Sequence, residues 1–238
     1  MDGVKKAVVV GASSGIGEQL ARLLSNEGYI VGLVARRKEK LLALQKQLPH
    51  ESYIKCIDIA HWNAKDLLKE FIEEMEGIDL MVVSAGVGHL NPDLILSLEK
   101  ETVDVNVSGF IAITNIAYNH FLSKDSGHIV GISSIGALMA NPAAPSYNAS
   151  KTFISNYLVS LRKKFKLQKN NIFVTDVKCG FIDTEMAKGN RDKMFWMAPP
   201  EKAALQIYEG IKKKKKTVYV TKRWRSIAWL LKLLFLFN

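Results

Sequence analysis

The sequence contains few cysteines and no break in composition. Cys56 and Cys179 are the only two among 238 residues, and they lie far apart in the chain. This argues against a disulfide framework or a zinc site and favours a reducing compartment. Neither an internal repeat nor a low-complexity linker divides the chain. We therefore expect one domain over residues 1–221, followed by a basic and apolar tail helix over residues 222–238.

A recognisable export signal is also lacking. The first residues, MDGVKKAVVVGASSGIG, contain no apolar stretch followed by a cleavage site and lead straight into a strand and a glycine loop. We expect a cytoplasmic protein, either free or peripheral at the inner face of a membrane.

The basic excess is concentrated towards the C-terminus. The formal net charge is +10, and residues 212–216 are five consecutive lysines. Because no recognition motif accompanies them, we do not expect a nucleic-acid partner. Residues 224–237 read WRSIAWLLKLLFLF, an apolar stretch of about 11 residues that is too short to cross a bilayer. It suits a helix lying in a membrane interface. Docking on its own domain or on another subunit, where it would cap the substrate pocket, is one alternative, and disorder is the other.

Short β-branched segments alternate with helical patterns along the chain. This order predicts a doubly wound α/β domain, with a parallel sheet and helices on both of its faces. The expected strands are 4–10, 29–35, 53–57, 78–84, 128–133, 172–177 and 217–221. The expected helices are 16–26, 38–48, 64–75, 98–121, 146–166 and 200–212.

A glycine cluster lies between the first expected strand and the first helix. Residues 11–17 read GASSGIG. Glycines allow a tight turn and a close approach of the backbone to a pyrophosphate, which the helix N-terminus attracts through its free N–H groups. A plain flexible turn is the alternative, but the strand before and the helix after favour a dinucleotide site.

The end of the second expected strand indicates which dinucleotide is bound. An NAD site usually has an acid there to accept from the ribose 2′-hydroxyl. Here residues 34–37 read VARR, and no acid occurs before Glu39. Since a guanidinium suits a 2′-phosphate, we expect NADP(H), with two solvated arginines as the alternative. Asp58, at the end of the third expected strand, is either a turn residue or an acceptor for the adenine amino group.

Tyr147 and Lys151 are candidates for proton transfer. Residues four apart share one face of a helix, and an ammonium beside a phenol favours the phenolate and lowers the tyrosine pKa. With seven tyrosines and many lysines in the chain, about one such pair is expected by chance. Tyr208 and Lys212 are a second pair of this kind, so only the upstream motifs distinguish the two.

Taken together, these motifs resemble the short-chain dehydrogenase/reductase family over residues 4–221. The order and spacing of its motifs agree with GASSGIG at 11–17, Asp58, Ser84-Ala85-Gly86, Asn106-Val107-Ser108-Gly109, Ile132-Ser133-Ser134 and Tyr147 to Lys151. The resemblance implies a seven-stranded Rossmann sheet of order 3-2-1-4-5-6-7. It also implies a nicotinamide cofactor across the carboxyl ends of the strands.

The resemblance also implies the roles of individual residues. Tyr147 matches the catalytic acid/base, and Lys151 the lysine that lowers its pKa and holds the nicotinamide ribose. Ser134 matches the serine that hydrogen-bonds the substrate oxygen, and Ser133 should face the other way because side chains alternate along a strand. Asn106 matches the asparagine that supports a water-linked proton path. The candidate cofactor contacts are Gly11, Ser13, Ser14, Gly15, Ile16, Gly17, Arg36, Arg37, Asp58, Ile59, Ser84, Ala85, Gly86, Asn106, Tyr147, Lys151, Gly180, Ile182 and Thr184.

Two departures from the family pattern concern the cofactor pocket. Ser84 stands where the family usually has asparagine, so Ser84 or another residue must supply that bracing. Cys179 stands where the family usually has proline, which adds a backbone N–H near the carboxamide end of the cofactor. Neither change touches the proton-transfer residues.

The activity that these residues imply is hydride transfer between NADP(H) and a carbonyl or alcohol. Methionines and aromatic residues over 180–199 indicate an adaptable apolar pocket, hence a lipophilic ketone, aldehyde or acyl derivative. A 3-oxoacyl thioester reductase is a narrower alternative, and an NADP-binding sensor or scaffold without turnover is an alternative of another class. The long helices at 98–121 and 146–166 resemble the family's dimer-forming pair, so a homodimer or homotetramer is expected by analogy. No metal site is expected.

Overall fold

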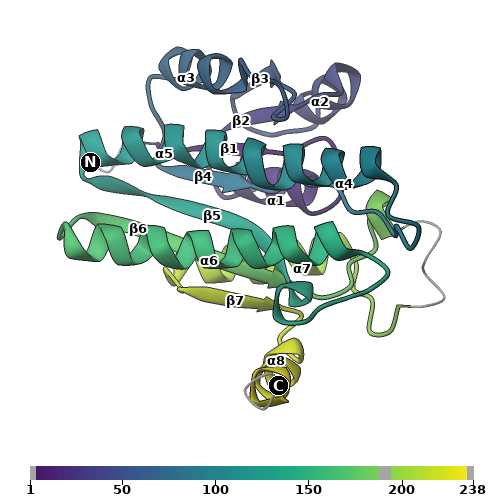
Figure 1. The fold of residues 1–238 in the computed structure, drawn as a ribbon. Helices are drawn as coiled ribbons and strands as arrows, with labels where there is room; N and C mark the ends of the chain where they lie inside the picture. The colour runs from purple at the N-terminus through teal and green to yellow at the C-terminus, as the bar shows by residue number, and fades with distance from the viewer. Residues whose placement is uncertain (1–3, 188–193, 235–238) are drawn as a thin grey trace.

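The computed structural model describes residues 4–187 and 194–234, and within these ranges seven parallel strands form one sheet (Figure 1). The order β3-β2-β1-β4-β5-β6-β7 confirms the predicted topology. The strands are β1 Lys6–Val10, β2 Ile30–Ala35, β3 Ser52–Cys56, β4 Leu80–Val83, β5 Ser126–Ser134, β6 Asn171–Cys179 and β7 Thr217–Val220. The carboxyl ends of β1 and β4 meet the glycine loop, so the topological switch point lies at the candidate cofactor site.

Helices cover both faces of the sheet. In Figure 1 the helices α5 and α6 run across the front, with α1 and α7 behind. The helices are α1 Gly15–Asn26, α2 Lys38–Gln45, α3 Ala64–Glu74, α4 Leu96–Val103, α5 Phe110–Lys124, α6 Pro145–Leu167, α7 Pro200–Lys212 and α8 Trp224–Leu234. Short 3-10 turns at Ile135–Leu138 and Glu185–Ala187 follow the ends of β5 and β6.

The apolar core is divided by the sheet into two layers, and β1 contributes to both. Ala7 and Val9 pack into the layer that contains α1, α2 and α7, whereas Val8 and Val10 pack into the layer that contains α3, α5 and α6. All four side chains are at most 1% exposed. A strand buried on both faces explains why this segment reads as a continuous apolar run rather than as an alternating one.

The helix predicted over 98–121 differs from the one observed. The chain is helical from Leu96 to Lys124, but a π-helical segment at Asp104–Gly109 interrupts the regular turns. Gly109 permits this path, since a Cβ there would lie 2.6 Å from the Ile59 carbonyl oxygen. π-helical turns are frequent at functional sites, and this one contains the candidate residue Asn106.

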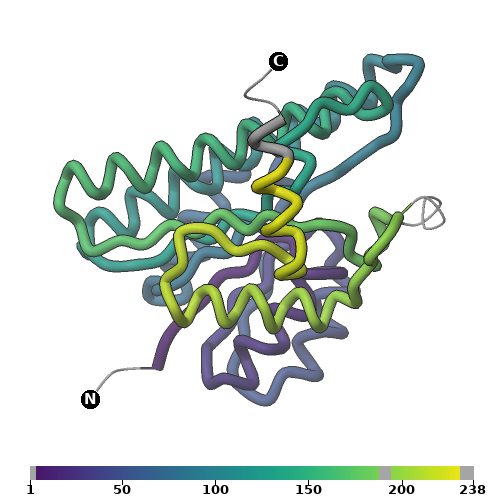
Figure 2. Tube along the Cα trace, turned by 90° about the horizontal axis from the view of Figure 1, so that it is seen from below, coloured from purple at the N-terminus to yellow at the C-terminus, as the bar shows by residue number. Residues whose placement is uncertain are grey.

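The tail begins with a docked helix. Trp224 and Ala228 of α8 are buried and pack against Ile135, and Phe181 also packs on this cluster. Figure 2 shows α8 leading away from the end of β7, and it contacts the 3-10 turn that follows β5. The first half of the tail therefore packs on its own domain, while residues 235–238 lie outside the described ranges. In the part of the chain that the structure describes, no helix has the length and apolar character to cross a membrane.

His128 on β5 makes the stability of the fold depend on pH. Its Nε2 lies 2.8 Å from Thr175 Oγ1, which itself donates to the Lys215 carbonyl, so Nε2–H must be the donor. Burial and then the positive charge of Lys214 lower the pKa of His128 to about 4. The unfolded chain, with a pKa near 6.5, therefore binds a proton at a higher pH than the folded protein does.

We expect the free energy of unfolding to fall by about 2 kcal/mol between pH 7 and pH 5 on account of His128 alone. Urea denaturation at the two pH values measures this change. His128→Gln should reduce the difference between pH 7 and pH 5 by about this amount and leave the part that comes from His120, whose pKa burial also lowers. Substitution of the exposed His61 is the control and should not remove the His128 contribution. A pH dependence that survives His128→Gln in full would assign it to other groups.

Candidate active site

Ser134 and Tyr147 are brought together by β5 and α6. Ser134 ends β5, and Tyr147 lies in the first turns of α6, whose N-terminus begins at Pro145. The Ser134 hydroxyl lies close enough to Tyr147 to act on the pKa of the phenol, which it lowers. Its Oγ also accepts from the Gly136 amide at 3.0 Å and lies 3.3 Å from the Cys179 carbonyl oxygen. The serine hydroxyl is thereby fixed beside the phenol, on the side of β5 opposite to Ser133.

Ser133 faces the other layer, as predicted from strand alternation. Its hydroxyl donates to the Asp176 carboxylate, and Asp176 also accepts from Ser155 Oγ at 2.8 Å. Lys178 Nζ forms an ion pair with the same carboxylate at 2.8 Å, and the Asp176 and Lys178 side chains are 1% and 6% exposed. A buried, fully bonded ion pair therefore lies behind the serine motif.

Lys151 lies one helical turn beyond Tyr147 and points towards the sheet. Its Nζ is 5.6 Å from the centre of the Tyr147 ring and 3.2 Å from the Ile132 carbonyl oxygen, to which it donates. Burial lowers the pKa of Lys151 to about 8, although Cys179 and Asp176 oppose the shift. This lysine can therefore change its protonation state close to neutral pH.

The predicted lowering of the Tyr147 pKa is wrong for this structure. Burial raises the pKa of Tyr147 above its usual range, and the hydrogen bond with Ser134 opposes the shift. The lysine does not dominate, because it is itself buried and its own charge is disfavoured. Tyr147 is consequently a protonated phenol, which is the form that a proton donor requires.

Asn106 is completely buried and braces the segment after β4. Its Oδ1 accepts from the Val87 amide at 2.9 Å, and its Nδ2 donates to the Val87 carbonyl at 2.8 Å and to Ser150 Oγ at 3.0 Å. Asn106 thus connects the loop after β4 to α6, close to Tyr147 and Lys151. The family's usual asparagine at the position of Ser84 would supply bracing of this kind. In this chain Asn106 braces the same segment.

The glycine loop has the close packing that a dinucleotide site requires. A Cβ at Gly11 would lie 2.5 Å from the Ala85 amide nitrogen, and a Cβ at Gly17 would lie 2.1 Å from the Gly11 carbonyl oxygen. Ser84 also adjoins the loop, since its Oγ would lie 3.3 Å from that second Cβ. The backbone therefore turns tightly into α1 and presents its N-terminus, which fits a pyrophosphate.

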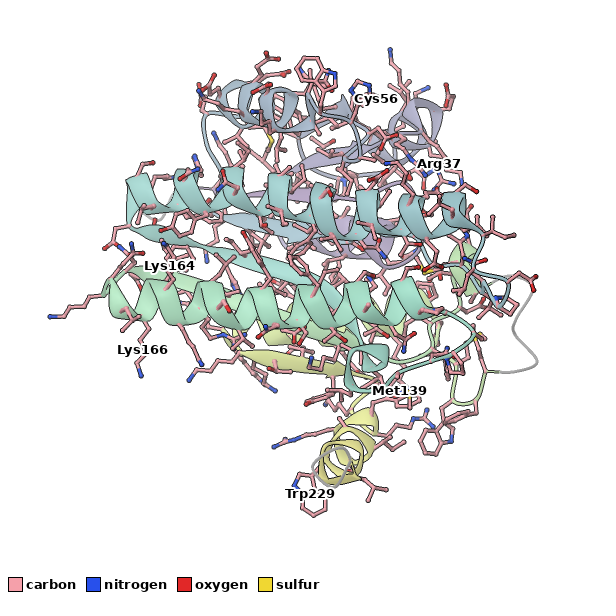
Figure 3. All side chains as sticks on the ribbon, viewed as in Figure 1. Arg37, Cys56, Met139, Lys164, Lys166 and Trp229 are labelled. Carbon is pink, nitrogen blue, oxygen red and sulfur yellow. The ribbon has the colours of Figure 1, made fainter. Side chains whose placement is uncertain are left out.

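The two arginines after β2 take different positions. Arg37 lies along the glycine loop and donates to Ser13 Oγ at 2.9 Å and to Ser14 Oγ at 2.8 Å. Arg36 Nη1 lies 3.9 Å from Asp58 Oδ2. Asp58 also accepts from the Ala60 amide at 3.1 Å, so its turn role is observed. Figure 3 shows Arg37 at the same edge of the molecule as the loops that follow the strands.

The remaining predicted cofactor contacts follow the carboxyl ends of the strands. Gly86 adjoins Lys151, whose Nζ would lie 3.3 Å from a Cβ at that position. Ile59 and Ile182 are buried, and Thr184 packs against Gly15. A Cβ at Gly180 would lie 1.9 Å from Trp224 Nε1, so this glycine makes room for the tail helix. Of the predicted substrate loop 180–199, residues 188–193 lie outside the described ranges.

Sequence reasoning missed two residues that position this site. A Cβ at Gly88 would lie 2.8 Å from the Tyr147 ring, so glycine allows the loop to close over the phenol. Asn148 donates to the carbonyl oxygens of Gly136 and Met139, both at 3.0 Å, and so holds the turn after Ser134. The glycine spacing at 86 and 88 was a usable signal for the first. Nothing in the sequence marked Asn148.

The sheet order and the glycine loop define a doubly wound dinucleotide-binding fold, and a tyrosine, a serine and a lysine converge beside that loop. Comparison with known proteins agrees with this class. The family profile described as short chain dehydrogenase matches residues 5–194. The chain therefore belongs to the short-chain dehydrogenase family and is an oxidoreductase of that type.

Related proteins and solved structures are consistent with this assignment. An uncharacterised oxidoreductase of Staphylococcus epidermidis is 32% identical over 188 residues, which cover 78% of this chain and 81% of the relative. A counterpart in Staphylococcus aureus is 33% identical over 185 residues, covering 76% and 79% of the two chains. A short-chain dehydrogenase from Streptomyces avermitilis superimposes with a TM-score of 0.84 at 21% identity, covering 98% and 93% of the two chains. That last likeness concerns the fold alone.

Proposed function

We propose that the protein transfers a hydride between NADP(H) and the carbonyl or alcohol carbon of a lipophilic substrate, with Tyr147 as the general acid/base. The observation that carries the proposal is the placement of the Ser134 hydroxyl beside a half-buried, protonated Tyr147, next to Lys151. The nicotinamide, when bound, supplies the hydride. The protein has to bind the substrate oxygen, stabilise its developing charge and deliver a proton.

The three side chains divide this work. In the reductive direction, the hydroxyl groups of Ser134 and Tyr147 donate hydrogen bonds to the substrate oxygen, and this stabilises the developing alkoxide. Tyr147 then releases its proton to that oxygen. Lys151, whose pKa burial lowers to about 8, supports the resulting phenolate and returns a proton to it. Asn106 and Asn148 act indirectly by holding the segments that carry these groups.

The cation arrangement beside the glycine loop supports NADP(H) over NAD(H). Arg37 is held on Ser13 and Ser14, and Arg36 lies beside it in the sequence, where an NAD site would have an acid. Two guanidinium groups and a serine hydroxyl at one edge match the donors that a 2′-phosphate prefers.

The proposed substrate class rests on aromatic packing at the start of the tail. Phe181, Phe195 and Trp196 surround Trp224, with ring centres between 5.5 and 5.9 Å from that of Trp224. Phe195 and Trp196 remain 56% and 46% exposed. An apolar surface of this kind next to Gly180 favours a substrate with an aliphatic or aromatic body.

Incubation with NADPH or NADH and a panel of carbonyl compounds tests the activity. The panel contains aliphatic ketones, aldehydes, steroids and 3-oxoacyl thioesters, and cofactor oxidation is followed by absorbance. We expect oxidation of NADPH in preference to NADH with apolar members of the panel. Tight NADPH binding without turnover of any member would instead favour a sensor or scaffold, and preference for the thioesters would favour the narrower reductase.

We propose further that α8 contacts an anionic membrane surface. Trp229 and Leu230 are 67% and 53% exposed, and Figure 3 shows Trp229 pointing away from the domain. Lys222, Arg223 and Arg225 are exposed at the start of the same helix. The five lysines at 212–216 precede β7, whereas α8 follows the other end of this strand. The five lysines are therefore not the cations nearest to α8. Exposed tryptophan beside basic residues is typical of an interfacial helix.

Co-sedimentation with phosphatidylglycerol vesicles measures this contact. We expect Trp229→Ser to reduce binding several-fold, because an aromatic anchor is lost from the interface. Trp62, which is 79% exposed on the loop before α3, is the matched control, and Trp62→Ser should leave binding unchanged. Binding that survives both Trp229→Ser and truncation after Thr221 would exclude α8 as the anchor.

A further inference from the structure

A carboxylate from the start of the substrate loop reaches across to the cations after β2. Glu185, in the 3-10 turn that follows β6, lies 2.6 Å from Arg37 Nη1 through Oε2 and 2.5 Å from Lys40 Nζ through Oε1. Arg37 and Glu185 are 148 residues apart in the chain. One carboxylate therefore bridges two cations and ties the segment after β6 to the segment after β2.

This connection passes directly over the glycine loop. Thr184 packs on Gly15, where a Cβ would lie 2.8 Å from Thr184 Cγ2. Beneath it, Arg37 donates to Ser13 and Ser14 with its other nitrogens. A groove of about 430 Å³ beside the loop is lined in part by Lys40, Thr184 and Glu185. We call the pair Thr184–Glu185 the strap.

The Glu185 carboxylate of the strap occupies a position in which its two cationic neighbours could also bind an anionic ligand. Hydrogen bonds from Lys40 and then from Arg37 lower the pKa of Glu185 to about 2, so its carboxylate is charged at any working pH. A guanidinium and an ammonium that converge on one carboxylate are arranged as they would be for a phosphate, which offers more charge and more acceptor oxygens. The three side chains are each between 42% and 43% exposed, so water and a ligand both have access to them.

We propose that Glu185 limits how strongly the site prefers NADP(H) over NAD(H), by occupying the 2′-phosphate position on Arg37 and Lys40, from which the phosphate of NADP(H) displaces it. The inference rests on the proposed use of NADP(H). Displacement frees the strap from the far side of the cleft, so the start of the substrate loop can move once the phosphorylated cofactor is bound. NAD(H), which has only a hydroxyl there, leaves the ion pairs intact.

Glu185→Gln tests the competition directly. The amide keeps the size of the side chain but removes the charge that opposes the phosphate. We expect the Kd for NADPH to fall about 5-fold, a change on the scale of one partly exposed charge pair, and the Kd for NADH to stay unchanged. Fluorescence titration of the full-length protein measures both constants. Glu70→Gln, an exposed carboxylate on α3, is the matched control and should change neither Kd.

Hydrogen exchange of residues 181–187 tests the release of the strap without turnover. We expect 2′-AMP to speed exchange in the wild type and 5′-AMP to leave it unchanged, whereas Glu185→Gln should exchange fast without either nucleotide. The proposed competition is refuted if Glu185→Gln raises the Kd for NADPH, changes the Kd values for NADPH and NADH by the same factor, or leaves both Kd values unchanged. A wild-type protein that binds NADH more tightly than NADPH refutes the proposed use of NADP(H). Failure of the proposed cofactor is therefore distinguishable from failure of the proposed role of Glu185.

Discussion

Tyr147→Phe is expected to lower kcat by at least about 100-fold while NADPH binding is preserved. Phenylalanine keeps the ring, which packs beneath Gly88, and removes only the hydroxyl that Ser134 contacts. A positioned general acid typically contributes a factor of about 10²–10⁴ to the rate. Steady-state oxidation of NADPH with a reactive ketone measures the loss, and fluorescence titration measures cofactor binding in the same preparation.

Tyr208→Phe is a matched control for this change. Lys212 Nζ lies 5.3 Å from the centre of the Tyr208 ring, close to the 5.6 Å that separates Lys151 from the Tyr147 ring. The Tyr208 hydroxyl, however, donates to Glu27 at 2.7 Å. We expect Tyr208→Phe to retain turnover. Wild-type rates in Tyr147→Phe would remove the acid/base role, and equal losses in both variants would point to structural damage.

The contrast between the two tyrosine–lysine pairs shows how far spacing alone carries a prediction. Helical periodicity correctly places each lysine over its tyrosine ring. It says nothing about burial, which raises the pKa of both phenols as the largest cause. The direction of the Tyr147 pKa shift was therefore mispredicted from the sequence, because desolvation depends on packing that the local sequence does not specify.

The sheet could be predicted because its information is local. The alternation of short apolar, partly β-branched segments with helical patterns predicts a parallel doubly wound sheet, whereas the order of its strands came from the resemblance to the short-chain dehydrogenase/reductase family. The same locality explains the predicted opposite facing of Ser133 and Ser134, which follows from their adjacency in β5. Their partners on β6 are Asp176 and Cys179. These partners could be identified only from the register of β5 and β6 in the structure.

Contacts between distant segments could not be predicted. Glu185 meets Arg37 across 148 residues, and Trp224 fills the space that Gly180 leaves. The π-helical turn that seats Asn106 depends on the close approach of Gly109 to Ile59. The local sequence around each of these residues does not indicate the contact that the residue makes. Asp176 and Lys178 are the two charged residues of β6, and buried charges must be paired, but the sequence alone did not show that both are buried.

Lys178→Met is expected to destabilise the protein by about 3–5 kcal/mol, the largest stability change that we predict. The variant leaves the Asp176 carboxylate, which is 1% exposed, without its cation. Ser133 and Ser155 still donate to that carboxylate, but two hydroxyl groups do not replace an ammonium. For a chain of this length the loss corresponds to a fall in Tm of roughly 6–20 °C, which calorimetry measures.

Two further variants separate a buried charge from a lost side chain. Lys178→Met combined with Asp176→Asn should recover most of the stability, because the amide removes the unpaired charge, its oxygen still accepts from one of Ser133 and Ser155, and its NH2 group can donate to the other hydroxyl. Lys213→Met breaks the exposed pair with Glu209, at 3.7 Å, and should cost less than about 1 kcal/mol. If the single variant Lys178→Met is no less stable than Lys213→Met, the ion pair on β6 does not hold the fold. If the double variant is as unstable as Lys178→Met alone, the loss comes from packing around the lysine stem rather than from the uncompensated carboxylate.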